Sequence, residues 1–345
     1  MRKLIGLLLI AAIGVGGWYA LTQVDTQVER DEQGGVQGIT VRPRGGSWTP
    51  MDGSEGQGDS GVSMLAPSVQ AVSRPTVRIA AYSAGGIEPH EFHRKAISNT
   101  LAQITQQFDV IAVQNVGGAN PSSLVSWIEA VRQAGGQYDF AVCEEARLRQ
   151  ETPYQAFIFN RATIEIDLDT VRSVEDPADQ FQHEPLVGLF RVRGPKPDEA
   201  FTFKLISVQI DPAYAMRELS LLPGLYRAAR DDGLGEDDIV LLGDFGVSAS
   251  RLMEALPNAT LSLAIPGGPT TARGVALPDN LLFSRRATSE FTGRFGAIDP
   301  RSQLGLDAET AHRLAAHLPV WAEFSSIEGG KPGFVAEQRS PQTRR

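Results

Sequence analysis

The sequence predicts an α/β protein in which strands pack on strands and helices cover the outer faces. Three observations favour this fold class. The ordered part of the chain opens with two strand–helix pairs, continues with several apolar strands in a row, and has its predicted helices in two separated layers. Of the 345 residues, this part accounts for one domain of about 250 residues, which is enough for a large layered core.

The opening of the ordered part is predicted to be strand, helix, strand, helix. Residues 77–82 (VRIAAY) form a short apolar run typical of a buried strand, and residues 92–107 carry apolar side chains at helical spacing. A second buried strand is predicted at residues 109–116 (DVIAVQNV). A helix over residues 122–134 follows it and ends at a pair of glycines.

The middle and the end of the chain are predicted to be rich in strands. Helices are expected at residues 214–230 and 250–256. No internal repeat is found, so a single mixed domain is expected. The expected strands cover residues 140–143, 156–160, 186–192, 201–208, 239–242, 280–283 and 319–324.

Charge and cysteine content exclude some classes of function. The net charge of −9 provides no overall basic field for a phosphate backbone, so the sequence gives no strong sign of nucleic-acid binding. The single cysteine, Cys143, cannot form an internal disulfide and lacks the neighbouring Cys and His residues of a zinc site. We interpret it as a packed small hydrophobic residue.

The N-terminal residues predict a membrane anchor. After two basic residues, residues 4–21 carry no charge, and this length is about the lower limit for crossing a bilayer. The basic residues place the N-terminus in the cytoplasm and the folded domain outside it, in the periplasm. A cleaved signal peptide, which would lead to secretion, is the alternative. The aromatic pair Trp18-Tyr19 and the lack of a clean Ala-x-Ala site favour an uncleaved transmembrane helix.

Composition divides the chain into four parts. Residues 1–21 are the anchor or signal peptide. Residues 22–76 are rich in Gly and Ser with almost no apolar periodicity, and are predicted to be a disordered linker. Residues 77–326 form the folded domain, and residues 327–345 are predicted to be a disordered tail.

Six separated stretches resemble, in order and spacing, the successive motifs of one family. They are VRIAAYSAGGI, FDVIAVQNVGG, KLISVQIDP, IVLLGDFGVS, PDNLLF and AAHLPVWAEF, and HEPLVGLFRVR also matches. The family is the endonuclease/exonuclease/phosphatase superfamily, whose fold resembles that of DNase I. The resemblance spans roughly residues 77–326 and implies a four-layer α/β sandwich of two β-sheets between helices.

The resemblance also implies a reaction, the hydrolysis of a phosphate ester assisted by Mg²⁺ or Mn²⁺. In that family an aspartate helps to activate water, and a histidine paired with a carboxylate stabilises charge on the phosphoryl group. The matching residues here are Asp244, Asp279 and His317, and the last two are expected to form a hydrogen-bonded pair. Asp211 matches a further frequent position of the family.

Most other positions of the family pattern are substituted. The principal metal-binding glutamate is replaced by Asn115, which removes a full charge from the cation site. The catalytic histidine is replaced by Gln209, which cannot carry positive charge or shuttle a proton. The remaining departures, which affect two asparagines, a glutamate and an aspartate of the family, lie at Ser83, Gly246, Pro153 and Ala316.

We therefore favour a membrane-tethered, extracytoplasmic domain that does not hydrolyse phosphate esters. It would act as a binding or structural module and need no metal cofactor. A protein partner or a phosphate-containing ligand would occupy the ancestral site. The alternative is an active Mg²⁺- or Mn²⁺-dependent phosphodiesterase or nuclease with a site rebuilt from Asp211, Glu88 or Asn115 beside Asp244. A third hypothesis is that the similarity concerns the fold alone.

Each candidate residue also has a structural interpretation. Asp244 would then be a turn residue at the end of a strand, His317 a satisfied core histidine, and Asn115 a polar residue that closes a strand. The acids between residues 231 and 238 are interpreted as a solvated loop, and residues 90–93 as an exposed loop before a helix.

Overall fold

The computed structural model describes residues 24–30, 36–43 and 69–329, apart from gaps at residues 86, 88, 118–121, 144–153, 257–259, 268–277, 300–305, 307–309, 311–313 and 315–316. The chain divides into two compact units, Met1–Trp48 and Thr49–Arg345. The predicted anchor at residues 4–21 and most of the predicted tail lie outside the described residues. Within the described part, every helix is too short or too polar to cross a membrane.

The first unit contains an antiparallel hairpin of β1 (Val24–Arg30) and β2 (Val36–Pro43). Val28 lies opposite Ile39 in its register. The hairpin differs from the prediction of a disordered linker over residues 22–76. Its sequence signal is the β-branched residue at every second position of VDTQVER, a pattern that favours a strand even in a polar stretch. Residues 44–68 of the predicted linker lie outside the described residues.

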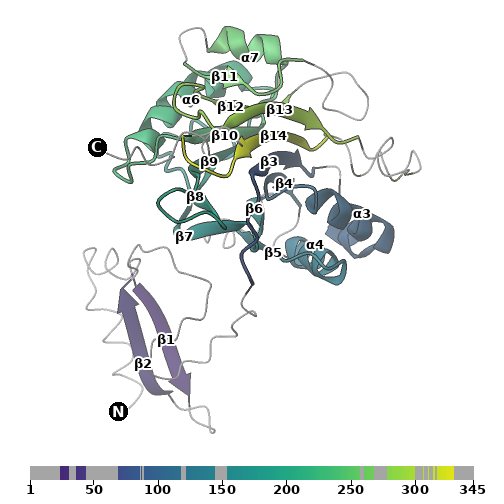
Figure 1. Ribbon diagram of the computed structural model, residues 1–345, viewed down its shortest axis with the longest axis vertical. Helices are drawn as coiled ribbons and strands as arrows, with labels where there is room; N and C mark the ends of the chain where they lie inside the picture. The colour runs from purple at the N-terminus through teal and green to yellow at the C-terminus, as the bar shows by residue number, and fades with distance from the viewer. Residues whose placement is uncertain are drawn as a thin grey trace, which may run out of the picture. The chain divides into compact units, whose positions relative to one another are not determined.

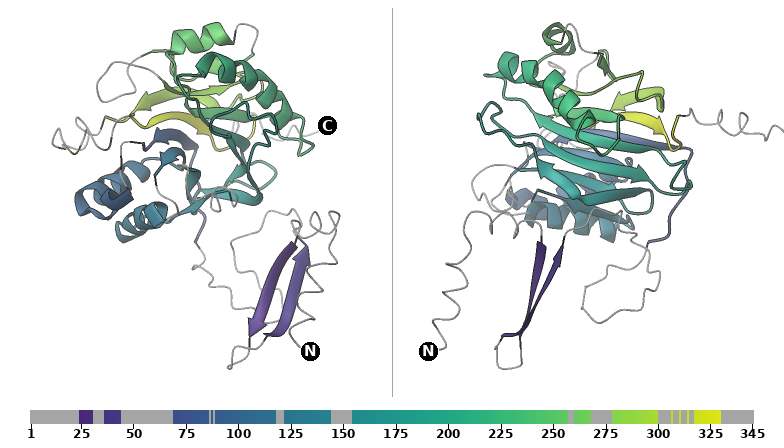
Figure 2. Two further views of the ribbon diagram at one scale, coloured as in Figure 1. Left: turned by 180° about the vertical axis from the view of Figure 1, so that it is seen from behind. Right: turned by 90° about the vertical axis from the view of Figure 1, so that its left-hand side faces the viewer.

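The second unit contains two six-stranded mixed sheets (Figures 1 and 2). The first sheet has the order β13 (Phe291–Ala297), β14 (Val320–Ser325), β3 (Thr76–Ser83), β4 (Val110–Val116), β6 (Tyr154–Asn160) and β5 (Tyr138–Ala141). The second has the order β11 (Ser262–Leu263), β12 (Asp279–Phe283), β10 (Ile239–Asp244), β9 (Thr202–Gln209), β8 (Leu186–Val192) and β7 (Ile164–Ser173). The pairs β3–β4 and β9–β10 are parallel, and the other pairs are antiparallel.

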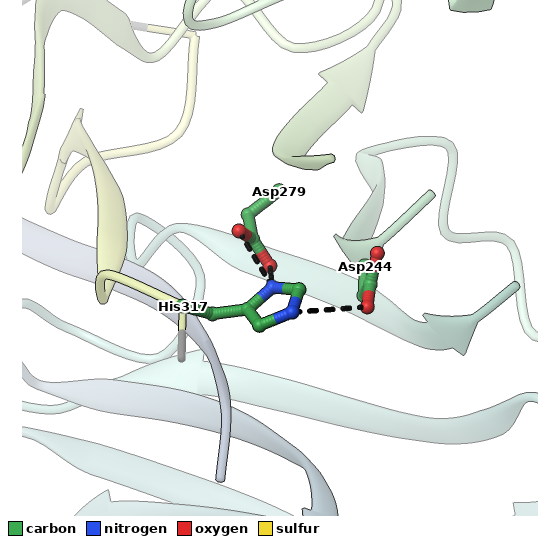
Figure 3. Close-up of side chains that lie close together, drawn as sticks. All are labelled: Asp244, Asp279 and His317. Atoms are coloured by element: carbon green, nitrogen blue, oxygen red, sulfur yellow. Dashed lines mark hydrogen bonds and ion pairs between the residues drawn. The ribbon is translucent and has the colours of Figure 1, made fainter. Parts of the chain in front are cut away.

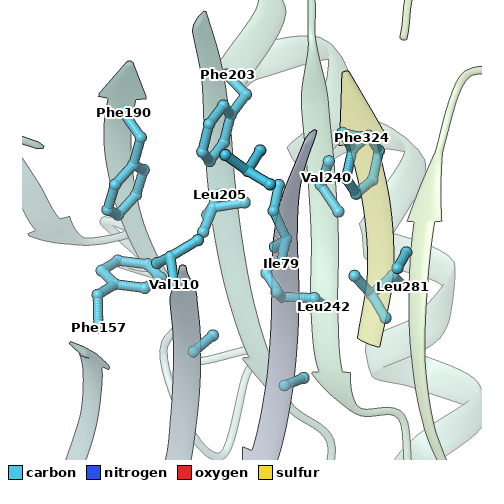
Figure 4. Packing of buried hydrophobic residues seen from close by; sticks show 14 of the residues in the cluster. Ile79, Val110, Phe157, Phe190, Phe203, Leu205, Val240, Leu242, Leu281 and Phe324 are labelled. Carbon is cyan, nitrogen blue, oxygen red and sulfur yellow. The ribbon is translucent and has the colours of Figure 1, made fainter. Parts of the chain in front are cut away.

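The two sheets pack face to face through large apolar side chains (Figure 4). Phe157 of the first sheet meets Phe190 of the second edge to face, with ring centroids 5.1 Å apart, and Phe190 stacks on Phe203 at 5.5 Å. All three are almost fully buried. Each such side chain contributes about 1.5–3 kcal/mol by leaving water, so this interior layer holds the sandwich together.

Helices cover the outer face of each sheet (Figure 2). The short η1 (Pro89–His93), α3 (Lys95–Thr105) and α4 (Ser122–Gln133) lie on the first sheet, where Trp127 packs against Tyr82 and donates a hydrogen bond to Thr105 Oγ1. On the second sheet lie α6 (Ala215–Arg230) and α7 (Ala249–Ala255). The predicted arrangement of two β-sheets between helices is therefore confirmed.

Sequence patterns missed mainly the strands at sheet edges. Three unpredicted strands, β7, β11 and β13, each lie at the end of a sheet. Edge strands pair on one side only and carry polar or charged side chains, as in β7 (IEIDLDTVRS), so their hydrophobic signal is weak. Cys143 is buried and free, as predicted.

Candidate active site

The end of β10 brings two aspartates together. Asp244, the last residue of β10, lies opposite Asp279, the first residue of the antiparallel strand β12. Before it, Gly243 has a φ of +138°, and a Cβ there would lie 2.1 Å from the carbonyl oxygen of Val208 on β9. Only glycine fits this position, so Gly243 allows β10 to end with Asp244 beside Asp279. The turn closes when the Gly246 amide donates to Asp244 Oδ1 at 2.9 Å.

His317 lies between the two carboxylates (Figure 3). Its Nδ1 is 2.9 Å from Asp279 Oδ1 and 3.0 Å from Oδ2. Its Nε2 faces Asp244 Oδ2 at 3.7 Å. The imidazole ring therefore bridges the first residue of β12 and the last residue of β10, and the structure contains the expected pair of His317 and Asp279.

The carboxylates keep this histidine protonated at neutral pH. Burial of His317 opposes its charge, but the hydrogen bond and charge of Asp279, together with the charge of Asp244, outweigh burial and raise the pKa of His317 to about 9. Burial raises the pKa of Asp244, while the charge of His317 and the Gly246 amide act in the opposite direction. The trio is thus an imidazolium held between two acids.

A buried amide network supports the site from behind. Gln114 Nε2 donates to Ser207 Oγ at 2.8 Å and to the Ala112 carbonyl oxygen at 3.1 Å. Ser207 in turn donates to Gln155 Oε1, so the network joins the two sheets. The Gln114 side chain lies close to Gly243, within 3.2 Å of the place that a Cβ would occupy. Sequence patterns did not identify Ser207 or Gln155, because both lie inside ordinary strands.

Neutral side chains lie at the ends of β3, β4 and β9. Gln209, at the end of β9, lies beside Asp244 in the register of the second sheet. Asn115, at the end of β4, has a φ of +55°, and its side chain packs against Gly85. Ser83 is buried at the end of β3. The ends of β4 and β9 therefore provide amides, which carry no charge to balance a cation.

The residues predicted as alternative metal ligands do not join the trio in the described part of the structure. Asp211 Oδ1 accepts from the Ala213 amide at 2.7 Å and so forms the turn before α6. Glu88, Pro153 and Ala316 lie outside the described residues.

Asp244, Asp279 and His317 each offer one ligand atom, and these atoms lie within 4.8 Å of one another, but the trio offers few oxygens for Mg²⁺ or Mn²⁺. Such a cation needs several oxygens directed at one point. Here both oxygens of Asp279 face the His317 ring, one oxygen of Asp244 accepts from the Gly246 amide, and the other faces the ring. The protonated ring already balances charge that a metal ion would otherwise balance.

The structure corrects two interpretations of polar segments. The acids of residues 231–238 do not all lie in a solvated loop, because Asp238 is only 2% exposed and Asp232 accepts from the buried ammonium of Lys204 at 2.8 Å. Residues 90–93 belong to a 3-10 helix in which Glu91 is buried, whereas an exposed loop was predicted. Asp238 directly precedes a buried strand, a position that could have indicated its burial.

Comparisons with known proteins give one similarity in sequence and several in structure. No family model matches the chain. The chain is 20% identical to human deoxyribonuclease-1-like 1 over 258 residues, which cover 72% of this chain and 84% of that protein. Truncated TDP2 of Caenorhabditis elegans aligns with a TM-score of 0.50 and 10% identity, over 72% of this chain and 98% of that one. An endonuclease/exonuclease/phosphatase from Bacteroides vulgatus aligns with a TM-score of 0.49 and 12% identity, over 73% of this chain and 100% of that one.

These identities are low, so the structural likeness concerns the fold. The two mixed sheets, the helices on their outer faces and the likeness to TDP2 agree with the resemblance of the sequence motifs. The chain therefore has the DNase I-like fold of the endonuclease/exonuclease/phosphatase superfamily.

Proposed function

We propose that this chain is a membrane-tethered, extracytoplasmic domain that binds a partner through its DNase I-like fold and has lost metal-dependent phosphoester hydrolysis. The observation that carries the proposal is the position of His317 between Asp244 and Asp279. In this arrangement the two acids interact with the imidazolium of His317 instead of binding a metal ion. The neutral amides of Asn115 and Gln209 cannot replace the missing charge.

The same geometry favours a protein partner over a phosphate-containing ligand. Both ring nitrogens of His317 face carboxylates, so neither N–H is directed at an incoming anion. The carboxyl groups of Asp244 and Asp279 lie on both sides of the ring, an environment that disfavours an approaching phosphate. A protein surface with hydrogen-bond donors suits this site better.

Membrane attachment rests on residues 4–21 and the two basic residues before them. We expect the full-length chain to stay with cytoplasmic membranes after an alkaline carbonate wash, and protease added outside spheroplasts to digest the domain. Recovery of the full-length chain in the soluble fraction would contradict an uncleaved anchor.

A second candidate function is an active phosphodiesterase or nuclease with a rebuilt site. It is favoured by the hydrogen-bonded pair of His317 and Asp279 beside Asp244, because a histidine oriented by a carboxylate is a recurring feature of hydrolytic sites. The proposal and this alternative differ in whether Asp244 supports turnover with a divalent cation.

Hydrolysis of bis-p-nitrophenyl phosphate in the presence of Mn²⁺ distinguishes the proposed binding domain from an active phosphodiesterase or nuclease. We expect the full-length protein and its Asp244→Asn variant to give the same rate, equal to that of buffer with Mn²⁺. The matched control is Asp237→Asn, because Asp237 is an exposed acid on the same segment of chain. A rate that depends on Asp244 and not on Asp237 would support the hydrolase and contradict the proposal.

A further inference from the structure

A second group of acids lies at the opposite end of β10. Asp238 directly precedes β10, Glu290 directly precedes β13, and Glu328 follows β14. One carboxylate oxygen from each lies within 4.8 Å of the others. We call these three residues the acidic cluster. Asp238 and Asp244 are six positions apart along an extended strand, about 20 Å, so the cluster is distinct from the candidate active site.

Two members of the acidic cluster are buried and only partly satisfied. Asp238 is 2% exposed and Glu290 is 1% exposed. Asp238 Oδ1 and Glu290 Oε2 have no hydrogen-bond partner among the described residues. Glu290 Oε1, in contrast, accepts from the Gly329 amide at 2.5 Å. A buried carboxylate oxygen without a partner is costly. The Thr288 hydroxyl lies near Asp238 and lowers this cost, whereas Glu290 Oε2 has no described donor, so the pair requires a proton or a bound cation.

The described part of the chain places no positive side chain on the acidic cluster. No described lysine, arginine or histidine forms an ion pair with any of its three members. Lys204 comes nearest in the sheet, since its backbone amide donates to the Asp238 carbonyl oxygen, but its ammonium binds Asp232 and the Ala229 carbonyl oxygen. Burial, followed by the charge of Glu290, raises the pKa of Asp238 well above its usual range.

We propose that the acidic cluster binds a hard divalent cation, with Ca²⁺ preferred, as a structural site that joins the two sheets. Asp238 belongs to the start of a strand in the second sheet, and Glu290 and Glu328 flank strands of the first. A cation bound to all three therefore links the sheets at the end opposite the candidate active site.

The geometry and the ligand chemistry agree with this choice of ion. Two oxygens bound to one Ca²⁺ at 2.3–2.6 Å can be up to about 5 Å apart, and the cluster satisfies this limit. All its ligands are oxygens, which disfavours Zn²⁺. Glu328 is exposed, so one side of the site is open to water and to an entering ion. Ca²⁺ accepts irregular geometry and extra waters more readily than Mg²⁺ does.

Thermal unfolding of the chelator-treated full-length protein, with and without 1 mM Ca²⁺, tests the proposal. We expect Ca²⁺ to raise the unfolding temperature of the unsubstituted protein by several degrees, because an ion that binds only the folded state stabilises it. Asp238→Asn and Glu290→Gln should lose this rise and bind Ca²⁺ at least tenfold more weakly by calorimetry. Asp244→Asn, which lies at the other end of β10 and leaves the cluster intact, should keep the rise in unfolding temperature.

The two cluster variants should also fold well. Both preserve shape and remove an acidic group whose charged form is disfavoured by burial, so their chelated forms should unfold at the same or a higher temperature than the chelated unsubstituted protein. The proposal is overturned if Ca²⁺ does not bind the unsubstituted protein, or if it stabilises the cluster variants equally.

Discussion

Strand β10 has a carboxylate at each end, half-buried at Asp244 and buried at Asp238, and the two ends differ in the charge that surrounds it. At the C-terminal end, Asp244 shares the imidazolium of His317 with Asp279. At the N-terminal end, Asp238 lies in an all-acidic cluster without a positive side chain among the described residues. One end is balanced by the protein itself, whereas the other requires a proton or an external cation.

A divalent ion is expected at the N-terminal end of β10 and not at the C-terminal end. In the superfamily pattern the C-terminal end is the metal-binding end, yet here Asp244 faces the ring of His317 and lies beside Gln209, a neutral amide. The acids of the N-terminal end come from three distant parts of the sequence, and two of them are fully buried. A count of acids in one motif would therefore direct attention to the wrong end of the strand.

Gly243→Ala should disturb the C-terminal end most strongly. Its Cβ would lie 2.1 Å from the Val208 carbonyl oxygen, and alanine is strained at a φ of +138°. We expect a loss of about 3 kcal/mol in the free energy of unfolding, measured by urea denaturation. Gly224→Ala is the matched control, because a Cβ there meets nothing within 4 Å inside α6 and should stabilise the protein by about 0.5–1 kcal/mol. Equal effects of the two changes would refute this account of Gly243.

His317→Gln should leave the C-terminal end of β10 without a positive side chain, as at its N-terminal end. The change removes the positive charge and leaves Asp244 and Asp279 side by side without a counter-charge. At pH 7 we expect a loss of about 2 kcal/mol in the free energy of unfolding, below the usual cost of breaking a fully buried pair because the histidine side chain is 22% exposed. A variant as stable as the unsubstituted protein would show that the imidazolium does not balance these acids.

The pH dependence of stability should reveal the same imidazolium. The pKa of His317 rises from 6.5 to about 9 on folding, so its stabilising contribution is complete below pH 6.5 and is lost as the pH rises through 9. We expect the stability difference between the unsubstituted protein and His317→Gln to shrink by roughly 2 kcal/mol over this window. Subtracting the two curves removes the groups that titrate in both proteins. A constant difference from pH 6 to pH 9.5 would contradict the raised pKa.

Much of the fold could be predicted from the sequence because its central strands are strongly apolar. The strand that contains Leu241 and Leu242 was expected, and the structure buries both residues completely. The edge strand β7 was missed because Asp167 and Asp169 interrupt its apolar pattern. Hydrophobic periodicity therefore predicts the buried central strands and misses strands at the edge of a sheet.

The sites divide in a similar way. Motif order predicted that His317 and Asp279 would meet, and the structure contains this pair. The acidic cluster could not be found in this way, since its members are far apart in sequence and Asp238 ends a run of acids that reads as a loop. Glu290 lies close to Asp238 only because the two sheets pack together.

Calorimetric titration of Mn²⁺ into the chelator-treated full-length protein at pH 7 tests the contrast between the two ends most directly, because Mn²⁺ suits carboxylate ligands at either end. We expect a saturable heat that is lost in Asp238→Asn and unchanged in Asp244→Asn. A dissociation constant of about 100 μM or tighter that depends on Asp244 would contradict this expectation, and would place a working metal site at the C-terminal end of β10.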